Sequence, residues 1–126
     1  MVCGCDENPV VRHNNHNPAI SSVVIFPETV GPSDSLVVIC TATDPDGDSL
    51  VYDWYSLSGT VVRIKGGLPG QIALYNTPQN FQVFYAPDSM YVAAPQDTFG
   101  IECAVRDGIG GGDVSGLLLF YVRKNL

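Results

Sequence analysis

Short runs of β-branched and aromatic residues recur along this chain from residue 19 to residue 123, and clusters of Gly, Pro, Asn and Asp separate them. No window keeps apolar residues at helical spacing behind a capping signal. Strands that recur about every ten residues are typical of an antiparallel sandwich or barrel. The sequence therefore predicts an all-β fold of seven or eight strands. The predicted strands are 19–26, 35–43, 50–57, 60–65, 71–75, 81–86, 98–106 and 116–123.

Length and charge limit the domain count and the partners. A chain of 126 residues is one domain by length, and we expect a tether over 1–18 followed by a sandwich domain over 19–126. The net charge of −7 and six scattered Lys and Arg residues leave no basic stripe for nucleic acid. No apolar run approaches the roughly 20 residues that cross a bilayer as a helix.

Alternation along three predicted strands points to a shared core around Cys40, Trp54 and Cys103. Side chains two residues apart lie on the same face of a strand. The residues that share a face with these three are all apolar: Leu36, Val38, Ala42, Leu50, Tyr52, Phe99, Ile101 and Val105. The opposite faces carry polar residues such as Thr41, Asp53 and Glu102, as expected of antiparallel strands that are wet on one side.

Three segments resemble one family of sandwich domains. TATDPDGDSL from Thr41, VFYAP from Val83 and FGIECAVRDGIGG from Phe99 are similar, in this order, to bacterial PKD-like and cadherin-like immunoglobulin modules. The resemblance implies an immunoglobulin-like antiparallel β-sandwich. It also implies a Cys40–Cys103 disulfide that joins the two sheets beside Trp54 and an oxidising compartment. The alternative is two reduced cysteines that pack as small hydrophobic side chains.

The start of the chain carries two further cysteines. Val2-Cys3-Gly4-Cys5 resembles the end of a bacterial lipobox, in which Cys5 would receive the lipid. The resemblance implies a protein outside the cytoplasm, in the bacterial cell envelope or secreted, whose only membrane contact is a lipid anchor on Cys5. A second hypothesis uses Cys3, Cys5, His13 and His16 as zinc ligands, although their spacing departs from common zinc fingers.

An acidic turn is the candidate metal site. Asp44, Asp46 and Asp48 offer three carboxylates within five residues, and carboxylate oxygens are the ligands that calcium prefers. In an immunoglobulin-like topology the loop that carries Asp107 lies at the same end, so we expect Asp107 to assist. The alternative is ordinary turn chemistry, in which Asp caps its own turn and Gly47 supplies a positive φ.

No catalytic constellation is visible in the sequence. The histidines His13 and His16 lie in the predicted tether, and no G-x-S-x-G segment occurs. The glycines from Gly108 to Gly112 join two predicted strands instead of opening a helix, so they do not match a dinucleotide site. The sequence predicts a protein that is not an enzyme and requires no cofactor, with calcium as the one candidate.

The last predicted strand suggests how the domain acts. Its residues are apolar on both faces, and we expect Leu117, Leu119 and Tyr121 to face outward as an interface. We therefore expect a non-catalytic interaction or structural module that contacts another envelope protein or assembles with itself. Two alternatives stay open: a carbohydrate-binding module that uses exposed tyrosines and calcium, and a decoration or tail module of a phage.

Overall fold

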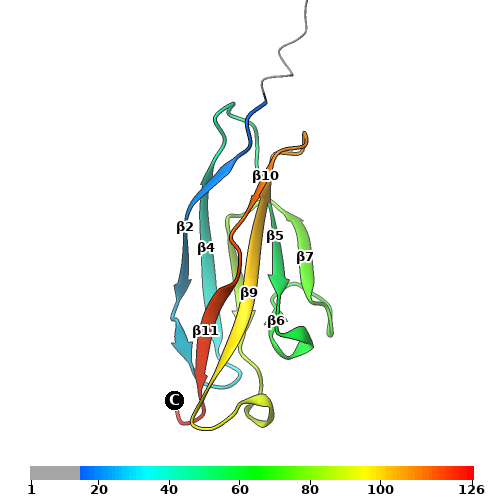
Figure 1. Ribbon diagram of the computed structural model, residues 1–126. Helices are drawn as coiled ribbons and strands as arrows, with labels where there is room; N and C mark the ends of the chain where they lie inside the picture. Colours follow the sequence, from blue (N-terminus) through cyan, green and yellow to red (C-terminus); the bar gives the residue numbers. More distant parts are fainter. Residues whose placement is uncertain (1–14) are drawn as a thin grey trace, which may run out of the picture.

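The computed structural model describes residues 15–126, which form two β-sheets in a sandwich (Figure 1). The six-stranded sheet has the order β3 (Thr29–Val30), β11 (Leu118–Arg123), β9 (Gln96–Arg106), β5 (Val51–Ser56) and β7 (Ala73–Thr77), and β10 (Gly112–Val114) also pairs with β9. The four-stranded sheet has the order β2 (Ala19–Phe26), β4 (Ser35–Thr43), β8 (Phe81–Tyr85) and β6 (Arg63–Ile64). Across residues 15–126 we find no helix with the length and apolar character of a membrane span.

The prediction of an all-β sandwich is confirmed, and the predicted number of strands is too low. Ten strands lie within residues 15–126, and β2 and β4 keep their predicted bounds. The two strands that the sequence did not predict, β3 and β10, have two and three residues. Such short segments cannot show the alternation of apolar and polar residues that marks a strand in a sequence. Of the predicted strand 60–65, only Arg63–Ile64 is extended, because a 3-10 turn over Gly59–Val61 precedes it.

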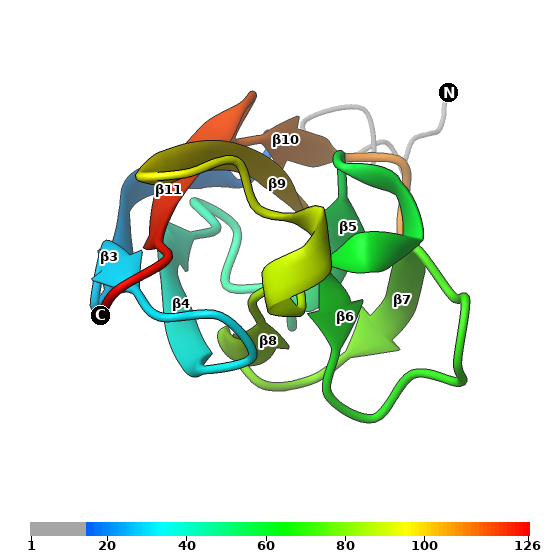
Figure 2. The same ribbon diagram turned by 90° about the horizontal axis from the view of Figure 1, so that it is seen from below.

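The core lies between the two sheets, where the predicted in-facing residues meet. Leu36, Val38, Ile101 and Val105 are buried, as are Tyr52 and Phe99, while Ala42 and Leu50 are partly buried against this cluster. Seen end-on in Figure 2, β4 and β8 lie opposite β9 and β11. The predicted alternation is therefore confirmed on all three strands.

Trp54 lies at the centre of this core with no exposed surface. The ring of Phe84 from the opposite sheet meets it edge-on, with centroids 6.4 Å apart and planes at 72°. The indole Nε1 donates to the Thr77 hydroxyl at 2.8 Å, so its only polar atom is satisfied in β7. The Trp54 side chain thus packs against both sheets, and its indole N–H is hydrogen-bonded.

Cys40 and Cys103 lie in the core on opposite sheets and are both fully buried. They are free thiols in the structure, so the expected disulfide is not formed there. A hydrogen bond between the two thiols, together with burial, raises the pKa of Cys103. Oxidation of this pair to a disulfide stays a prediction.

One end of the sandwich gathers three segments that are distant in sequence. The β4–β5 loop, the β9–β10 loop and the segment that precedes β2 all lie at this end, which we call the apex, and the C-terminus lies at the other end (Figure 1). The backbone N–H of Ile20 donates to the Asp113 carboxylate at 2.8 Å, which fixes the start of β2 beside β10.

Candidate functional site

Three carboxylates converge at the apex. One carboxylate oxygen from each of Asp44, Asp46 and Asp48 lies within 4.8 Å of the others. The loop bends tightly enough to do this because Gly47 adopts φ +76° and donates its N–H to the Asp44 carbonyl at 3.0 Å. The side chain of Asp44 accepts the N–H of Asp46 at 2.8 Å through Oδ1. Turn chemistry therefore uses one oxygen of Asp44 and leaves the other free.

Two oxygens of this cluster have no hydrogen-bond donor. Oδ2 of Asp44 and Oδ2 of Asp48 are both shielded from solvent and unpaired, and so is Oδ1 of Asn15. Most shielded polar atoms in folded proteins have a partner, so three orphan acceptors at one end of a small domain need an explanation. All three are oxygens, the atom type that calcium binds.

The segment before β2 reaches into the same site. The backbone N–H of His16 donates to Asp46 at 2.7 Å, and its ring Nδ1 lies 3.1 Å from the other oxygen of that carboxylate. Asn15 immediately precedes it, and its amide donates to Asp107 in the β9–β10 loop at the same end of the sandwich. Of the four residues in the zinc hypothesis, His16 therefore contacts a carboxylate, while Cys3, Cys5 and His13 lie outside the described residues.

Asp107 lies at the apex, but both of its carboxylate oxygens already accept hydrogen bonds. Oδ1 accepts the N–H groups of Ile109 and Gly111 at 2.9 and 2.8 Å, and Oδ2 accepts the amide of Asn15 at 3.0 Å. Asp107 is not part of the cluster of carboxylates that Asp44, Asp46 and Asp48 form. In this arrangement Asp107 orients the Asn15 amide and leaves Oδ1 of Asn15 unpaired.

Negative charge accumulates at this site. Burial, followed by the charges of Asp44, Asp46 and Asp107, raises the pKa of Asp48. The two hydrogen bonds from His16 instead lower the pKa of Asp46. The charge of Asp107 acts on both groups, which supports the prediction that its loop and the acidic turn share one end.

The residues present fit a calcium ion. Calcium takes six to eight oxygen ligands from carboxylates, amides, carbonyls and water, with flexible geometry. Asp44, Asp46 and Asp48 supply clustered carboxylates, and the unpaired amide oxygen of Asn15 at the same end is a further candidate ligand. A bound cation would pair the orphan oxygens and offset the charge that raises the pKa of Asp48.

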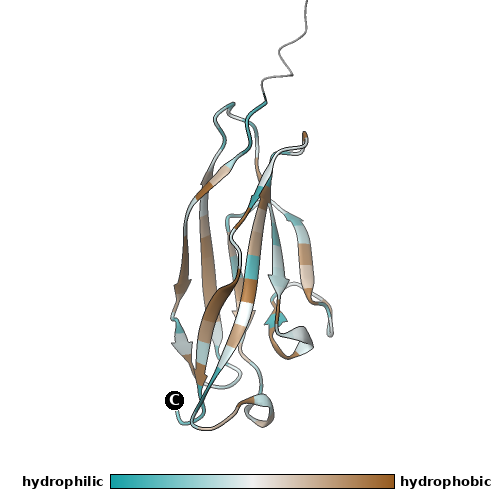
Figure 3. Ribbon diagram, in the orientation of Figure 1, coloured by the Kyte–Doolittle hydropathy of each residue, from teal (hydrophilic) through white to brown (hydrophobic). Residues whose placement is uncertain are grey.

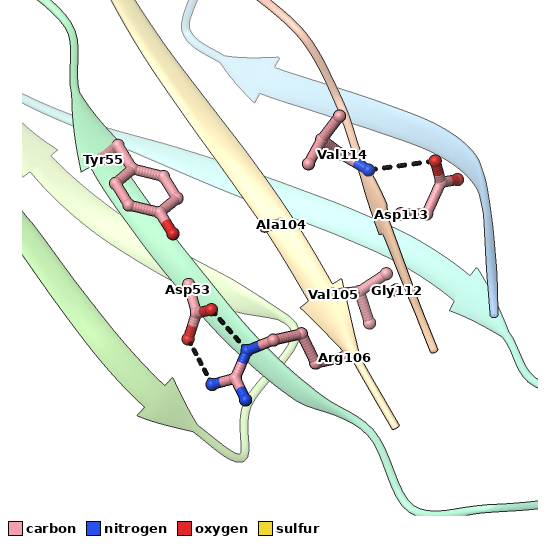
Figure 4. Close-up of a pocket in the computed structure, with 8 residues that line it drawn as sticks. All are labelled: Asp53, Tyr55, Ala104, Val105, Arg106, Gly112, Asp113 and Val114. Carbon is pink, nitrogen blue, oxygen red and sulfur yellow. Dashed lines mark hydrogen bonds and ion pairs between the residues drawn. The ribbon is translucent and has the colours of Figure 1, made fainter. Parts of the chain in front are cut away.

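A second site lies on the outer face of the six-stranded sheet. An open pocket of about 370 Å³ is lined by Asp53, Tyr55, Arg106 and residues of β9 and β10 (Figure 4). Asp53 was predicted to face water, yet it is only 3% exposed, because Arg106 folds over it. Arg106 donates through Nε at 2.7 Å and Nη2 at 3.0 Å, and the N–H of Asn76 adds a third bond at 2.9 Å.

Burial raises the pKa of Asp53, but these hydrogen bonds and the guanidinium charge outweigh it and hold the pKa below its usual range. The carboxylate is thus a paired structural anion that accepts three hydrogen bonds. The two residues occupy diagonal positions on neighbouring strands, since Val51 pairs with Arg106 and Asp53 with Ala104. An acid and a base at diagonal positions of neighbouring strands attract each other, but only the strand register shows that these two residues are such a pair.

The predicted interface trio does face outward. Leu117 and Leu119 are exposed, and Tyr121 is half-buried. Leu117 lies on Gly100, where an added Cβ would meet its side chain at 2.8 Å. The alternate residues Phe120 and Val122 are fully buried. The predicted lipidation site, Cys5, lies outside the described residues.

Comparison with known proteins adds no relative. No protein-family model matches this chain, and no curated protein matches it.

Proposed function

We propose that this chain is a non-catalytic, PKD-like immunoglobulin module of a bacterial cell envelope, which binds calcium at its apex and contacts another protein or itself. The observation that carries the calcium site is the cluster of three carboxylates in which Asp44 and Asp48 each keep a shielded, unpaired oxygen, together with an unpaired oxygen on Asn15 at the same end. The two-sheet fold and the buried Cys40, Trp54 and Cys103 are compatible with the resemblance noted in the sequence.

Calcium at this place would act as a structural staple. Asp44, Asp46 and Asp48 come from the β4–β5 loop, while Asn15 comes from the segment that leads into β2. A shared ion would therefore fix the direction in which the preceding residues leave the sandwich. Such control of orientation suits a module that stands between an anchor and a partner.

Calorimetry and thermal unfolding test the calcium site. We expect the full chain, stripped with EDTA, to bind calcium with a Kd of about 10⁻⁴ to 10⁻³ M, the range of extracellular modules. Calcium at ten times the Kd adds about 1.4 kcal/mol to the free energy of unfolding. That raises Tm by about 5 °C for a domain of this size.

Asp48→Asn is the informative variant, and Glu28→Gln is its control. Both remove one negative charge, but Glu28 is exposed and follows β2 at the end opposite the apex. We expect Asp48→Asn to abolish the calcium-dependent rise in Tm without lowering Tm in EDTA, because Oδ2 of Asp48 has no donor to lose. Absence of binding heat at millimolar calcium would contradict the calcium site and leave ordinary turn chemistry as the role of these Asp residues.

Carbohydrate binding is the second candidate function, and one observation favours it. Tyr75 is exposed beside the half-buried Tyr55, with ring centroids 5.7 Å apart, next to the pocket that holds Asp53 and Arg106. Sugars commonly stack on such rings while charged groups bond their hydroxyls. A glycan array with the parent and Tyr75→Ala decides: loss of a signal supports this function, and no signal with the parent excludes it.

A further inference from the structure

The outer face of the four-stranded sheet is apolar across three adjacent strands. Strand pairing aligns Val24, Ile39 and Phe81 in one row and Phe26, Val37 and Val83 in the next. Their neighbours Val23, Ile25, Val38 and Phe84 turn inward to the core, so these six point outward. Figure 3 shows β2 and β4 as a nearly continuous hydrophobic band. We call the six residues the outer patch.

Much of this patch remains in contact with water. Val24 is 51% exposed, Ile39 40%, Phe81 47% and Phe26 71%, while Val37 and Val83 are half-buried. With about 150–250 Å² for each Phe side chain and less for Val and Ile, these fractions leave roughly 300–400 Å² of apolar surface exposed on one sheet face. That equals the largest apolar patch of a typical monomer, and such patches are often functional.

No carboxylate interrupts the outer patch. The outward positions that border it are Ser22, Thr41, Ser35 and Tyr85. Two basic residues lie at its β6 edge: Arg63, whose guanidinium is 5.2 Å from the centre of the Tyr85 ring, and Lys65, whose backbone N–H donates to the Val83 carbonyl at 3.0 Å. The chain as a whole carries thirteen acidic and six basic residues. Two copies therefore repel each other when their acidic surfaces meet, whereas this face carries no carboxylate and lets them approach without repulsion between carboxylates.

We infer that the outer patch binds a second copy of this chain, so that the two four-stranded sheets pack face to face about a two-fold axis. An apolar face without carboxylates can pack against its own copy, and a two-fold interface requires such self-complementarity. Two such sheets pack with their strands about 30° apart. A stable dimer buries about 800 Å² per partner, so the exposed patch would form about half, with the half-buried valines and the polar border supplying the rest.

This inference rests on the proposed role as an interaction module and names its partner. It also differs from the sequence prediction, which placed the interface around Leu117, Leu119 and Tyr121 on the other sheet. The calcium site lies at the apex, away from the middle of the four-stranded sheet. Failure of the calcium site and failure of the dimer can therefore be distinguished by measuring self-association in both EDTA and calcium.

Sedimentation of the full chain with Ile39→Glu and Leu119→Glu tests the inference. Both side chains are apolar and about equally exposed, at 40% and 38%, but they lie on opposite sheets. We expect a concentration-dependent dimer that Ile39→Glu weakens by about tenfold or more, because two carboxylates would meet near the axis. Leu119→Glu should leave the dimer unchanged.

Several results would overturn the inference. A parent chain that is monomeric at every concentration in EDTA and in calcium has no such interface. Loss of the dimer with Leu119→Glu but not with Ile39→Glu would place the interface on the six-stranded sheet. Should Ile39→Glu fail to fold, Ile39→Thr keeps a β-branched residue at the same place, and an undiminished dimer in that folded variant also contradicts the inference.

Discussion

Removing the guanidinium of Arg106 should expose how much the outer ion pair stabilises the sandwich. Arg106→Met keeps a long side chain over Asp53 but deletes two hydrogen bonds to Asp53, a third to the Asn76 side chain, and the positive charge. The carboxylate, which is 3% exposed, then keeps only the N–H of Asn76. The variant thus leaves a buried anion without its counter-ion.

The expected loss follows from this geometry. Breaking a buried pair by removing one partner costs about 3–5 kcal/mol. The Arg106 side chain is 41% exposed, so water reaches part of the vacated position and lowers the cost to about 2–3 kcal/mol. Asp53→Asn keeps the shape and one acceptor, and should cost about 1–2 kcal/mol. The double variant should cost less than the sum of the two, because the pair is already broken.

Urea unfolding followed by Trp54 fluorescence measures these losses, since the chain has a single tryptophan in the core. The folded pKa of Asp53 is lowered from 3.8, so the pair stabilises the fold above that pH and stops doing so as the pH falls through the lower folded value. The difference between the parent and Arg106→Met should therefore shrink at low pH. The account would be refuted if Arg106→Met lowered the free energy of unfolding by less than about 0.5 kcal/mol at pH 7. It would also be refuted if the variant lowered it by the same amount at pH 7 and at low pH.

Three further predictions concern the core and the apex. Phe84→Ala should lower the free energy of unfolding by about 3–5 kcal/mol in urea, because it empties the space beside Trp54, whereas the exposed Met90→Ala should change it by less than about 0.5 kcal/mol. Mass spectrometry of oxidised protein should find Cys40 joined to Cys103, and Cys103→Ala should then cost about 2–5 kcal/mol; thiols that stay reduced in an oxidising buffer would show that the pair only packs. Gly111→Ala should weaken calcium binding in calorimetry, because the added Cβ would collide with a carboxylate oxygen of Asp107, which orients Asn15.

Alternation along three strands identified the centre of the core of this protein. The in-facing sets around Cys40, Trp54 and Cys103 could be read from every second residue, and all of them are buried or partly buried. This works because the pleat of a strand is local: side chains two residues apart share a face whatever the strand pairs with. The acidic turn was visible for the same reason, since its three carboxylates lie within five residues.

Long-range pairing decided the features that the sequence did not reveal. Asp53 is buried because strand β9 places Arg106 diagonally across it, and Asn15 joins the apex because Asp107, 92 residues later, holds its amide. The outer patch likewise exists only where β2, β4 and β8 align their out-facing rows.

The local sequence pattern thus determined which residues share a strand face and which turn brings several carboxylates together. It could not tell which of two apolar faces is covered, because coverage depends on which strands become neighbours. That choice is made by the packing of the whole domain, in which the free energy of burying one face of each sheet outweighs any preference within a single strand. In this protein the packing buried Val38 and Phe84 and left Ile39 and Phe81 at the surface.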